Sequence, residues 1–160
     1  MQRRRKMATE KKHFISLSKL FILFILNCLI CSKTYSQPVW NWIQPEPTGN
    51  VLYSIHFVNQ LKGYACGSLG TIIITTNGGG NWKLQNSSTS QDLFEIFFTD
   101  EKSGVAVGKA GFILATSNGG GHWTLKNSGT QNNLHDIAFT NNTTAYVCGL
   151  NGTILKTTDR

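Results

Sequence analysis

The chain has 160 residues and a formal net charge of +7, with 40% hydrophobic and 14% charged residues. Eight of its 15 lysines and arginines precede Gln37, and the seven that follow are matched by seven acidic residues. The positive charge therefore belongs to the N-terminus. A nucleic-acid-binding protein needs a basic face or stripe, which the rest of the chain lacks, so we exclude nucleic acid as a partner.

The first 36 residues have the layout of a secretory signal peptide. A basic stretch precedes an apolar run over residues 20–31 that only Asn27 interrupts, and Thr34 and Ser36 are small residues just before Gln37. The run has 12 residues, whereas a helix that spans a bilayer needs about 20. We expect residues 1–36 to be removed, residues 37–160 to be secreted or periplasmic, and no stable membrane span to remain. An uncleaved membrane anchor is the alternative.

A repeat of 41 residues follows the leader. The same offset relates leucine, isoleucine, phenylalanine and glycine positions in three successive copies. These positions are Leu52, Leu93 and Leu134; Ile55, Ile96 and Ile137; Phe57, Phe98 and Phe139; Gly67, Gly108 and Gly149; and Gly70, Gly111 and Gly152. A period near 40 with several short strands in each unit is typical of propeller blades.

The middle copy shows how one unit should fold. An apolar strand over residues 93–99 is followed by a polar turn, a short strand over 104–108 and a tight hairpin at Lys109-Ala110. A third strand over 111–116, a glycine turn over 118–121 and a fourth strand over 122–126 complete the unit. Four antiparallel strands in about 40 residues match a blade, so we predict an all-β protein with about three four-stranded blades in an incomplete ring.

The first strand of each copy is apolar on both faces, which predicts that it lies between neighbouring blades. One repeat position within these strands is polar in all three copies and is occupied by Ser54, Glu95 and Asp136. In a propeller this position would point toward the central channel. The alternative is an ordinary hydrated inner surface.

The glycine turn is a second shared motif, with Ser or Thr, then Asn or Asp, then glycines and a tryptophan. A short Asn or Asp side chain can accept backbone hydrogen bonds within a turn, glycine permits the chain reversal, and a buried indole ring would hold the corner. We expect a structural role for the residues of this motif, which are Thr75, Asn77, Gly79 and Trp82; Thr116, Asn118, Gly120 and Trp123; and Thr157 and Asp159.

The turn resembles the Asp-box, or bacterial neuraminidase repeat, and the whole unit resembles the propellers of the photosystem II assembly-factor family. The segments that carry this resemblance are Lys126-Asn127-Ser128-Gly129-Thr130, Gly104-Val105-Ala106-Val107-Gly108 and Gly152-Thr153-Ile154-Leu155. It extends over about residues 40 to 160 and implies a scaffold that binds a protein or assists assembly. Members of the family from non-photosynthetic bacteria share the blade without the photosynthetic role.

Complete propellers have about 4 to 8 blades, so about three blades would leave apolar residues such as Ile55 and Phe57 uncovered. We therefore expect a truncated N-terminal piece of a longer propeller. A second hypothesis rests on Trp40-Asn41-Trp42-Ile43-Gln44, which resembles a fourth strand without a blade before it. This strand could complete the last blade, and two chains could then close a six-bladed ring as a homodimer.

Two cysteines follow the leader, Cys66 and Cys148, and they occupy the same position in alternate repeats. Equivalent strands of alternate blades are too far apart for a disulfide, which needs Cα atoms within about 7 Å. We expect two buried thiols that pack as small apolar residues.

We predict no catalytic, cofactor-binding or metal-binding residues. Sialidase-like enzymes clamp a carboxylate with three arginines, but only Arg160 follows Ser36. The histidines have no metal-ligand spacing, and the glycine turn lacks the lysine of a phosphate-binding loop. The favoured function is a secreted, non-catalytic propeller segment that binds an unidentified protein. The rival is the N-terminal part of an extracellular glycosidase-like or sialidase-like propeller with catalytic residues in further blades.

Overall fold

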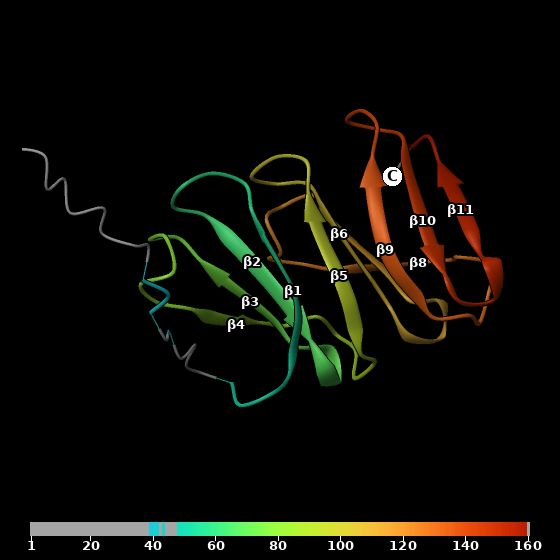
Figure 1. Cartoon of the computed structure of the whole chain (residues 1–160). Coiled ribbons are helices and arrows are strands. Elements are labelled where there is room, and N and C mark those ends of the chain that lie inside the picture. The colour runs from blue at the N-terminus through green and yellow to red at the C-terminus, as the bar shows by residue number, and fades with distance from the viewer. Residues whose placement is uncertain (1–38, 42, 44–47, 160) are drawn as a thin grey trace, which may run out of the picture. The chain divides into compact units, whose positions relative to one another are not determined.

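The computed structural model describes residues 39–41, 43 and 48–159 (Figure 1). The expected signal peptide lies outside these residues, and so does most of the segment 40–44. Residues 39–41 carry no helix or strand and belong to a unit separate from residues 42–160. In the described part of the chain, no helix has the length and apolarity needed to cross a membrane.

Three antiparallel sheets follow one another along the chain, and each corresponds to one copy of the repeat (Figure 1). The first blade consists of β1 (Leu52–Phe57), β2 (Gly63–Gly67), β3 (Ile72–Thr75) and β4 (Lys83–Gln85). The middle blade consists of β5 (Leu93–Phe98), β6 (Gly104–Gly108), β7 (Ile113–Thr116) and β8 (Thr124–Lys126). The third consists of β9 (Leu134–Phe139), β10 (Ala145–Gly149) and β11 (Ile154–Thr157). The all-β propeller architecture is thereby confirmed.

The connection between the second and third strands differs from the predicted two-residue hairpin. In the middle blade it is a 3₁₀ turn over Lys109–Gly111, in which Ala110 and Gly111 both have a positive φ. The residues equivalent to Ala110 are Leu69 and Asn151, and both adopt the same left-handed conformation. The third strand consequently begins at Ile113, two residues later than predicted.

The interface between the first and middle blades is rich in aromatic residues, and we call it the first interface. The Tyr64 ring stacks on Phe98 with centroids 3.6 Å apart, and Trp123 meets the other side of this cluster edge-on to Phe98 at 5.9 Å. The buried core of this interface comprises Tyr64, Cys66, Ile72, Leu93, Ile96, Phe98, Ala106, Leu114 and Trp123.

We call the side of a blade that faces the preceding blade its leading face, and the opposite side its trailing face.

The second interface, between the middle and third blades, is built from smaller aliphatic side chains. Val105 occupies the repeat position of Tyr64, and Val147 occupies that of Ala106. At these two positions the first interface has a large and a small side chain, Tyr64 and Ala106. The second interface has two valines of intermediate size. The buried core consists of Val105, Val107, Leu134, Ile137, Ala145 and Val147.

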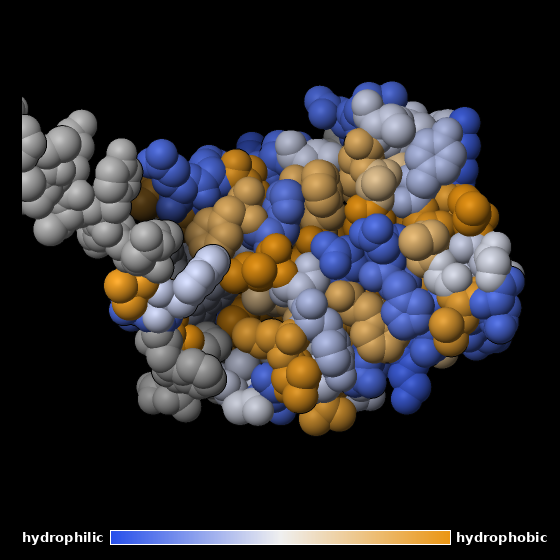
Figure 2. Space-filling view, in the orientation of Figure 1, coloured by the Kyte–Doolittle hydropathy of each residue, from blue (hydrophilic) through white to orange (hydrophobic). Residues whose placement is uncertain are grey.

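The leading face of the first blade and the trailing face of the third blade have no described blade against them. Ile55 is 61% exposed and Phe57 is 41% exposed, as expected for an incomplete ring. The surface around β1 is accordingly apolar in the space-filling view (Figure 2). Cys148 is exposed, so the prediction of two buried thiols is wrong for this residue. Its equivalent, Cys66, is buried because the middle blade covers it.

Candidate functional site

An aromatic row crosses the first strands of the three blades, and we define it by Tyr53, Phe94 and His135. Each of these residues is the extra residue of a β-bulge, because the pairing skips from Leu52 to Ser54 in β1 and does the same in β5 and β9. The rings of Tyr53 and Phe94 meet at 5.5 Å, and those of Phe94 and His135 stack at 4.9 Å. A bulge re-aims a side chain, so the same local irregularity joins three blades into one surface.

This row is not among the sites predicted from the sequence. Its signal was nevertheless present, because an aromatic residue precedes Ser54, Glu95 and Asp136 at the same repeat position. Tyr53 is 47% exposed and His135 is also exposed, whereas Phe94 between them is half-buried. The row therefore offers a partly accessible aromatic strip along the first strands.

The polar positions next to the row do not share one environment. Ser54 is buried, and its hydroxyl donates to the Glu95 carboxylate at 2.9 Å and accepts from the Ile96 backbone N–H at 3.4 Å. Glu95 is half-buried, whereas Asp136 is exposed. The three predicted channel residues thus form a chain of neighbours whose first member is covered by the middle blade.

Burial raises the pKa of the Glu95 carboxyl above its ordinary value. The hydrogen bond from Ser54 works in the opposite direction, and the charge of Asp136 raises the pKa further. Glu95 is therefore harder to ionise than an exposed glutamate, and Asp136 places a second carboxyl beside it.

Two polar side chains of the first interface, those of His56 and Tyr64, form hydrogen bonds with the backbone of the middle blade. His56 lies with its Nε2 3.0 Å from the Phe98 carbonyl oxygen, and burial lowers the pKa of its imidazole. The neutral ring can donate this hydrogen bond. Burial together with nearby carboxylates raises the pKa of Tyr64 to about 12, so its hydroxyl stays protonated and donates to the Gly119 carbonyl oxygen at 3.3 Å.

The Asp-box residues lie in the corners after the third strands. In the first corner, the Thr75 hydroxyl donates to the Asn77 Oδ1 at 3.0 Å and accepts from the Gly79 N–H at 2.9 Å. Asn77 Oδ1 also accepts from the Asn81 N–H at 2.9 Å.

The second corner repeats these bonds with Thr116, Asn118 and Gly120, and Thr157 bonds Asp159 at 2.7 Å in the third. Trp123 is buried in the first interface, whereas Trp82 is half-buried on the open leading face. The polar side chains of these corners are occupied by local bonds and have little capacity for chemistry.

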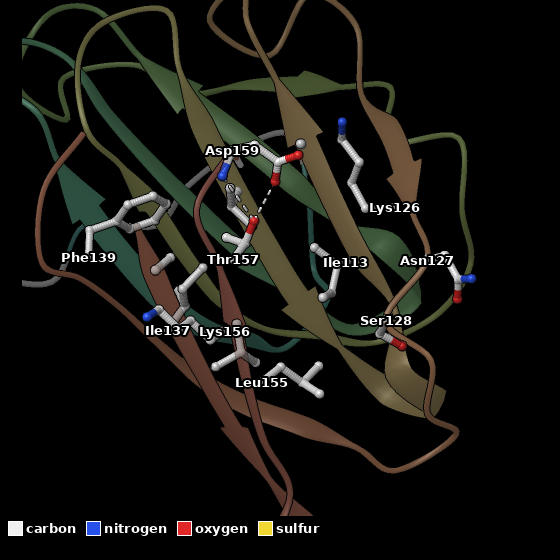
Figure 3. A pocket seen from close by; sticks show the side chains of 14 residues that line it. Ile113, Lys126, Asn127, Ser128, Ile137, Phe139, Leu155, Lys156, Thr157 and Asp159 are labelled. Carbon is white, nitrogen blue, oxygen red and sulfur yellow. Dashed lines mark hydrogen bonds between the residues drawn. The ribbon is translucent and has the colours of Figure 1, made fainter. Parts of the chain in front are cut away.

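A cavity of about 350 Å³ opens between β7 and β8 of the middle blade and β10 and β11 of the third (Figure 3). Its apolar wall includes Ile113, Phe139 and Leu155, which are one repeat from Ile72, Phe98 and Leu114 of the first interface. In the first interface those equivalents belong to the same buried cluster as Trp123. The cavity therefore marks a packing position for a large side chain, with Lys126 and Asp159 at its polar margin.

The described residues contain no group of three or more His, Cys, Asp or Glu side chains that could hold a metal ion. Nor do residues 39–41, 43 and 48–159 contain an arginine that could clamp a carboxylate. The chemistry that the described surface offers is aromatic contact and a weakly acidic row.

These sheets define a segment of a β-propeller with Asp-box corners. The profile of the family described as photosynthesis system II assembly factor YCF48 matches residues 32–125, which is more than half of the chain. The chain belongs to this family. No curated protein sequence matches it.

Solved structures agree on the fold. A structure described as YCF48 bound to D1 peptide matches with a TM-score of 0.69 and 22% identity, over 78% of this chain and 41% of that one. YCF48 from Cyanidioschyzon merolae matches with a TM-score of 0.62 and 20% identity, over 72% and 39%. An ancestral GH74 enzyme matches with a TM-score of 0.55 and 22% identity, over 68% and 17%. The chain thus spans less than half the length of the YCF48 chains that it matches.

Proposed function

We propose that the chain is a non-catalytic propeller segment that binds an extended peptide of a partner protein along its first strands. The aromatic row carries this proposal, because three bulges present Tyr53, Phe94 and His135 at the same place on successive blades. Aromatic residues are enriched at protein interfaces, where they supply large contact areas at low entropic cost. A strip that crosses three blades suits an extended ligand better than a compact one.

The ring geometry favours a peptide over a sugar. A sugar platform needs exposed and roughly parallel aromatic faces. Here Phe94 turns one face toward His135, with only 25° between the ring planes, while Tyr53 meets Phe94 at 61°. The family description as an assembly factor and the relative solved with a D1 peptide both support a role in protein binding. The carboxylates of Glu95 and Asp136 next to the row favour a peptide that carries a basic residue.

A binding screen of the purified chain against displayed peptides and against a panel of oligosaccharides tests this proposal. We expect peptides to be selected, with affinity reduced at least tenfold by the double substitution Tyr53→Ala and Phe94→Ala. Leu125→Ala is the matched control, because Leu125 is 57% exposed on β8 and lies outside the row. Peptide binding that the double variant retains, or selection of oligosaccharides alone, would contradict the proposal.

A carbohydrate-active propeller is the second candidate, and the pair Glu95 and Asp136 is the observation that favours it. Glycosidases commonly use one carboxyl with a raised pKa and one ionised carboxylate, and the pKa of Glu95 is raised in this way. Hydrolysis of a β-glucan by the purified chain that Glu95→Gln abolishes would support this candidate. Unchanged hydrolysis in that variant would assign the activity to a contaminant.

We also propose that the protein acts outside the cytoplasm, on the basis of the basic and apolar pattern of residues 1–36. N-terminal sequencing of the protein purified from its host should then begin at Gln37. A mature protein that begins at Met1 or Met7 would contradict this location.

A further inference from the structure

We infer that this propeller opens at the second interface, where the third blade separates from the middle blade while the first and middle blades stay together as one rigid pair. Both interfaces join blades that the structure describes, so their equivalent positions can be compared one by one. Several side chains that cross the first interface form directional hydrogen bonds. Their equivalents in the second interface are apolar, shorter or of like charge.

Two side chains of the first blade hold turns of the middle blade at one end of the first interface. The Lys62 ammonium group donates to the Glu101 carbonyl oxygen at 2.6 Å and lies 3.9 Å from the Glu101 carboxylate. The Tyr64 hydroxyl donates to the Gly119 carbonyl oxygen at 3.3 Å. The equivalents of these two side chains are Ser103 and Val105. The serine is much shorter than the lysine and the valine has no polar side-chain atom, so neither bond recurs at the described second interface.

The same change recurs along the inner strands. His56 Nε2 lies 3.0 Å from the Phe98 carbonyl oxygen, and the Cys66 thiol donates to the Leu93 carbonyl oxygen at 3.3 Å. The equivalents of His56 and Cys66 are Phe97 and Val107. Neither side chain has a hydrogen-bonding nitrogen, oxygen or sulfur atom. At these positions the second interface therefore depends on packing, as in the stack of Phe97 on Phe139 at 5.3 Å.

One position replaces an attraction by a repulsion. In the first interface the Ser54 hydroxyl donates to the Glu95 carboxylate at 2.9 Å. One repeat later, Glu95 itself takes the position of the serine and Asp136 takes that of the glutamate. Burial raises the pKa of Glu95, and the charge of Asp136 raises it further. Two carboxyls thus disfavour each other's ionisation across the second interface.

One hydrogen bond is common to both interfaces and marks the pivot. Asp92 Oδ1 accepts from the Leu69 N–H, and Asn133 Oδ1 accepts from the Ala110 N–H, both at 3.0 Å. These acceptors directly precede the first strands, whereas the Lys62 and Glu101 contacts lie in the turns that follow them. The third blade therefore stays attached at the start of its first strand and opens at the end of that strand.

A hollow already lies at the end that opens. It has a volume of about 220 Å³ and is lined by residues 97–99 and 139–142 of the middle and third blades. At the same end of the first interface, the Asn59 amide donates to the Glu101 carboxylate at 3.0 Å beside the Lys62 contact. The second interface is thus less closed at the place where the polar contacts of the first are missing.

Thiol alkylation followed by peptide mass spectrometry tests the joint, because Cys66 and Val107 share a repeat position and both are 0% exposed. Val107→Cys places a thiol in the second interface, Cys66 reports on the first, and the exposed Cys148 is the reference for an unprotected thiol. We expect the thiol at position 107 to react about tenfold faster than Cys66, since local opening exposes it more often. Unfolding of the whole chain exposes both thiols alike, so the ratio of their rates within one protein reports local opening.

Exchanging one pair of side chains between the interfaces shows whether these contacts cause the difference. Tyr64→Val with Ala106→Val gives the first interface the valines of the second, and it should raise the rate at Cys66 toward the rate at position 107. Val105→Tyr with Val147→Ala is the reverse exchange and should lower the rate at position 107. Both exchanges are made in the Val107→Cys background, and far-ultraviolet circular dichroism verifies that each variant folds.

Leu125→Ala is the matched control and should change neither rate, because Leu125 is 57% exposed on β8. A thiol at position 107 that reacts no faster than Cys66 would overturn the inference. Rates that both exchanges leave unchanged would overturn it as well, because the faster reaction at position 107 would then have a cause other than the contacts between the blades.

Discussion

The leading faces of the first and middle blades carry nearly the same residues, yet one is open and the other is covered. Ile96 and Phe98 of the middle blade are 0% and 2% exposed, whereas their equivalents Ile55 and Phe57 are 61% and 41% exposed. The local sequence of a blade therefore determines its sheet and its corners. Whether a neighbouring blade covers a face determines how much the apolar residues of that face contribute to stability. Matched substitutions on the two faces measure that difference.

The largest effect should come from the tryptophan of the covered face. Trp123→Ala should lower the free energy of unfolding by about 3–5 kcal/mol, because it empties a buried site in the first interface. Trp82→Ala should cost less than about 1.5 kcal/mol, since Trp82 has no described blade against it. Urea denaturation measures both values. Equal losses would show that the neighbouring blade contributes nothing to the role of this residue.

A smaller effect should separate two glycines with the same backbone conformation. Gly111 and Gly152 have φ angles of 75° and 70°, so alanine should cost about 1–2 kcal/mol at either position. At Gly111 the added Cβ would also collide with the Thr130 carbonyl oxygen, whereas at Gly152 it would meet nothing within 4 Å.

We therefore expect Gly111→Ala to cost about 3 kcal/mol in total and Gly152→Ala about 1 kcal/mol. The same denaturation experiment measures this difference. A cost at Gly152 as large as that at Gly111 would show that backbone conformation alone sets the requirement for glycine.

The smallest effect concerns the acidic row. The raised pKa of Glu95 means that the folded state binds its proton more tightly than the unfolded state. The stability that Glu95 contributes is therefore fully present below the ordinary pKa of 4.5 and is lost as the pH rises through the raised value. Glu95→Gln keeps an oxygen that can accept the bond from Ser54 and removes the charge.

This variant should be more stable than the unsubstituted chain at pH 7, by less than about 1 kcal/mol because the site is partly exposed to solvent. The gain should vanish below pH 4.5. Thermal unfolding of both proteins as a function of pH checks this dependence. A gain that is independent of pH would exclude ionisation of Glu95 as its cause.

The sequence predicts the fold well because the same strands and turns recur in each repeat. Apolar strands separated by glycine turns recur every 41 residues, and the three sheets form at the positions that this repeat predicts. The turn at Lys109–Gly111 was harder to predict. Its left-handed Ala110 is held by the backbone bond from the Phe112 N–H to the Lys109 carbonyl oxygen, and nothing in the composition of the turn indicates that geometry.

The candidate site was only partly predictable. The sequence shows that Ser54, Glu95 and Asp136 share a repeat position, but it does not show that Ser54 is buried and bonded to Glu95. The aromatic row depends on bulges, which arise from strand pairing and leave no separate mark on a single strand. The exposure of Cys148 depends on whether another blade covers its face, which the local sequence does not determine.

The threonine and asparagine corners also bear on how the protein acquires its structure. Their hydrogen bonds span only two to four residues, as in the bonds from Thr75 to Asn77 and from the Gly79 N–H to Thr75. Contacts this close in sequence need little loop closure and form within microseconds. Each corner can therefore begin folding without its neighbours, and the chain can assemble from any blade outward, as expected of a linear array of repeats.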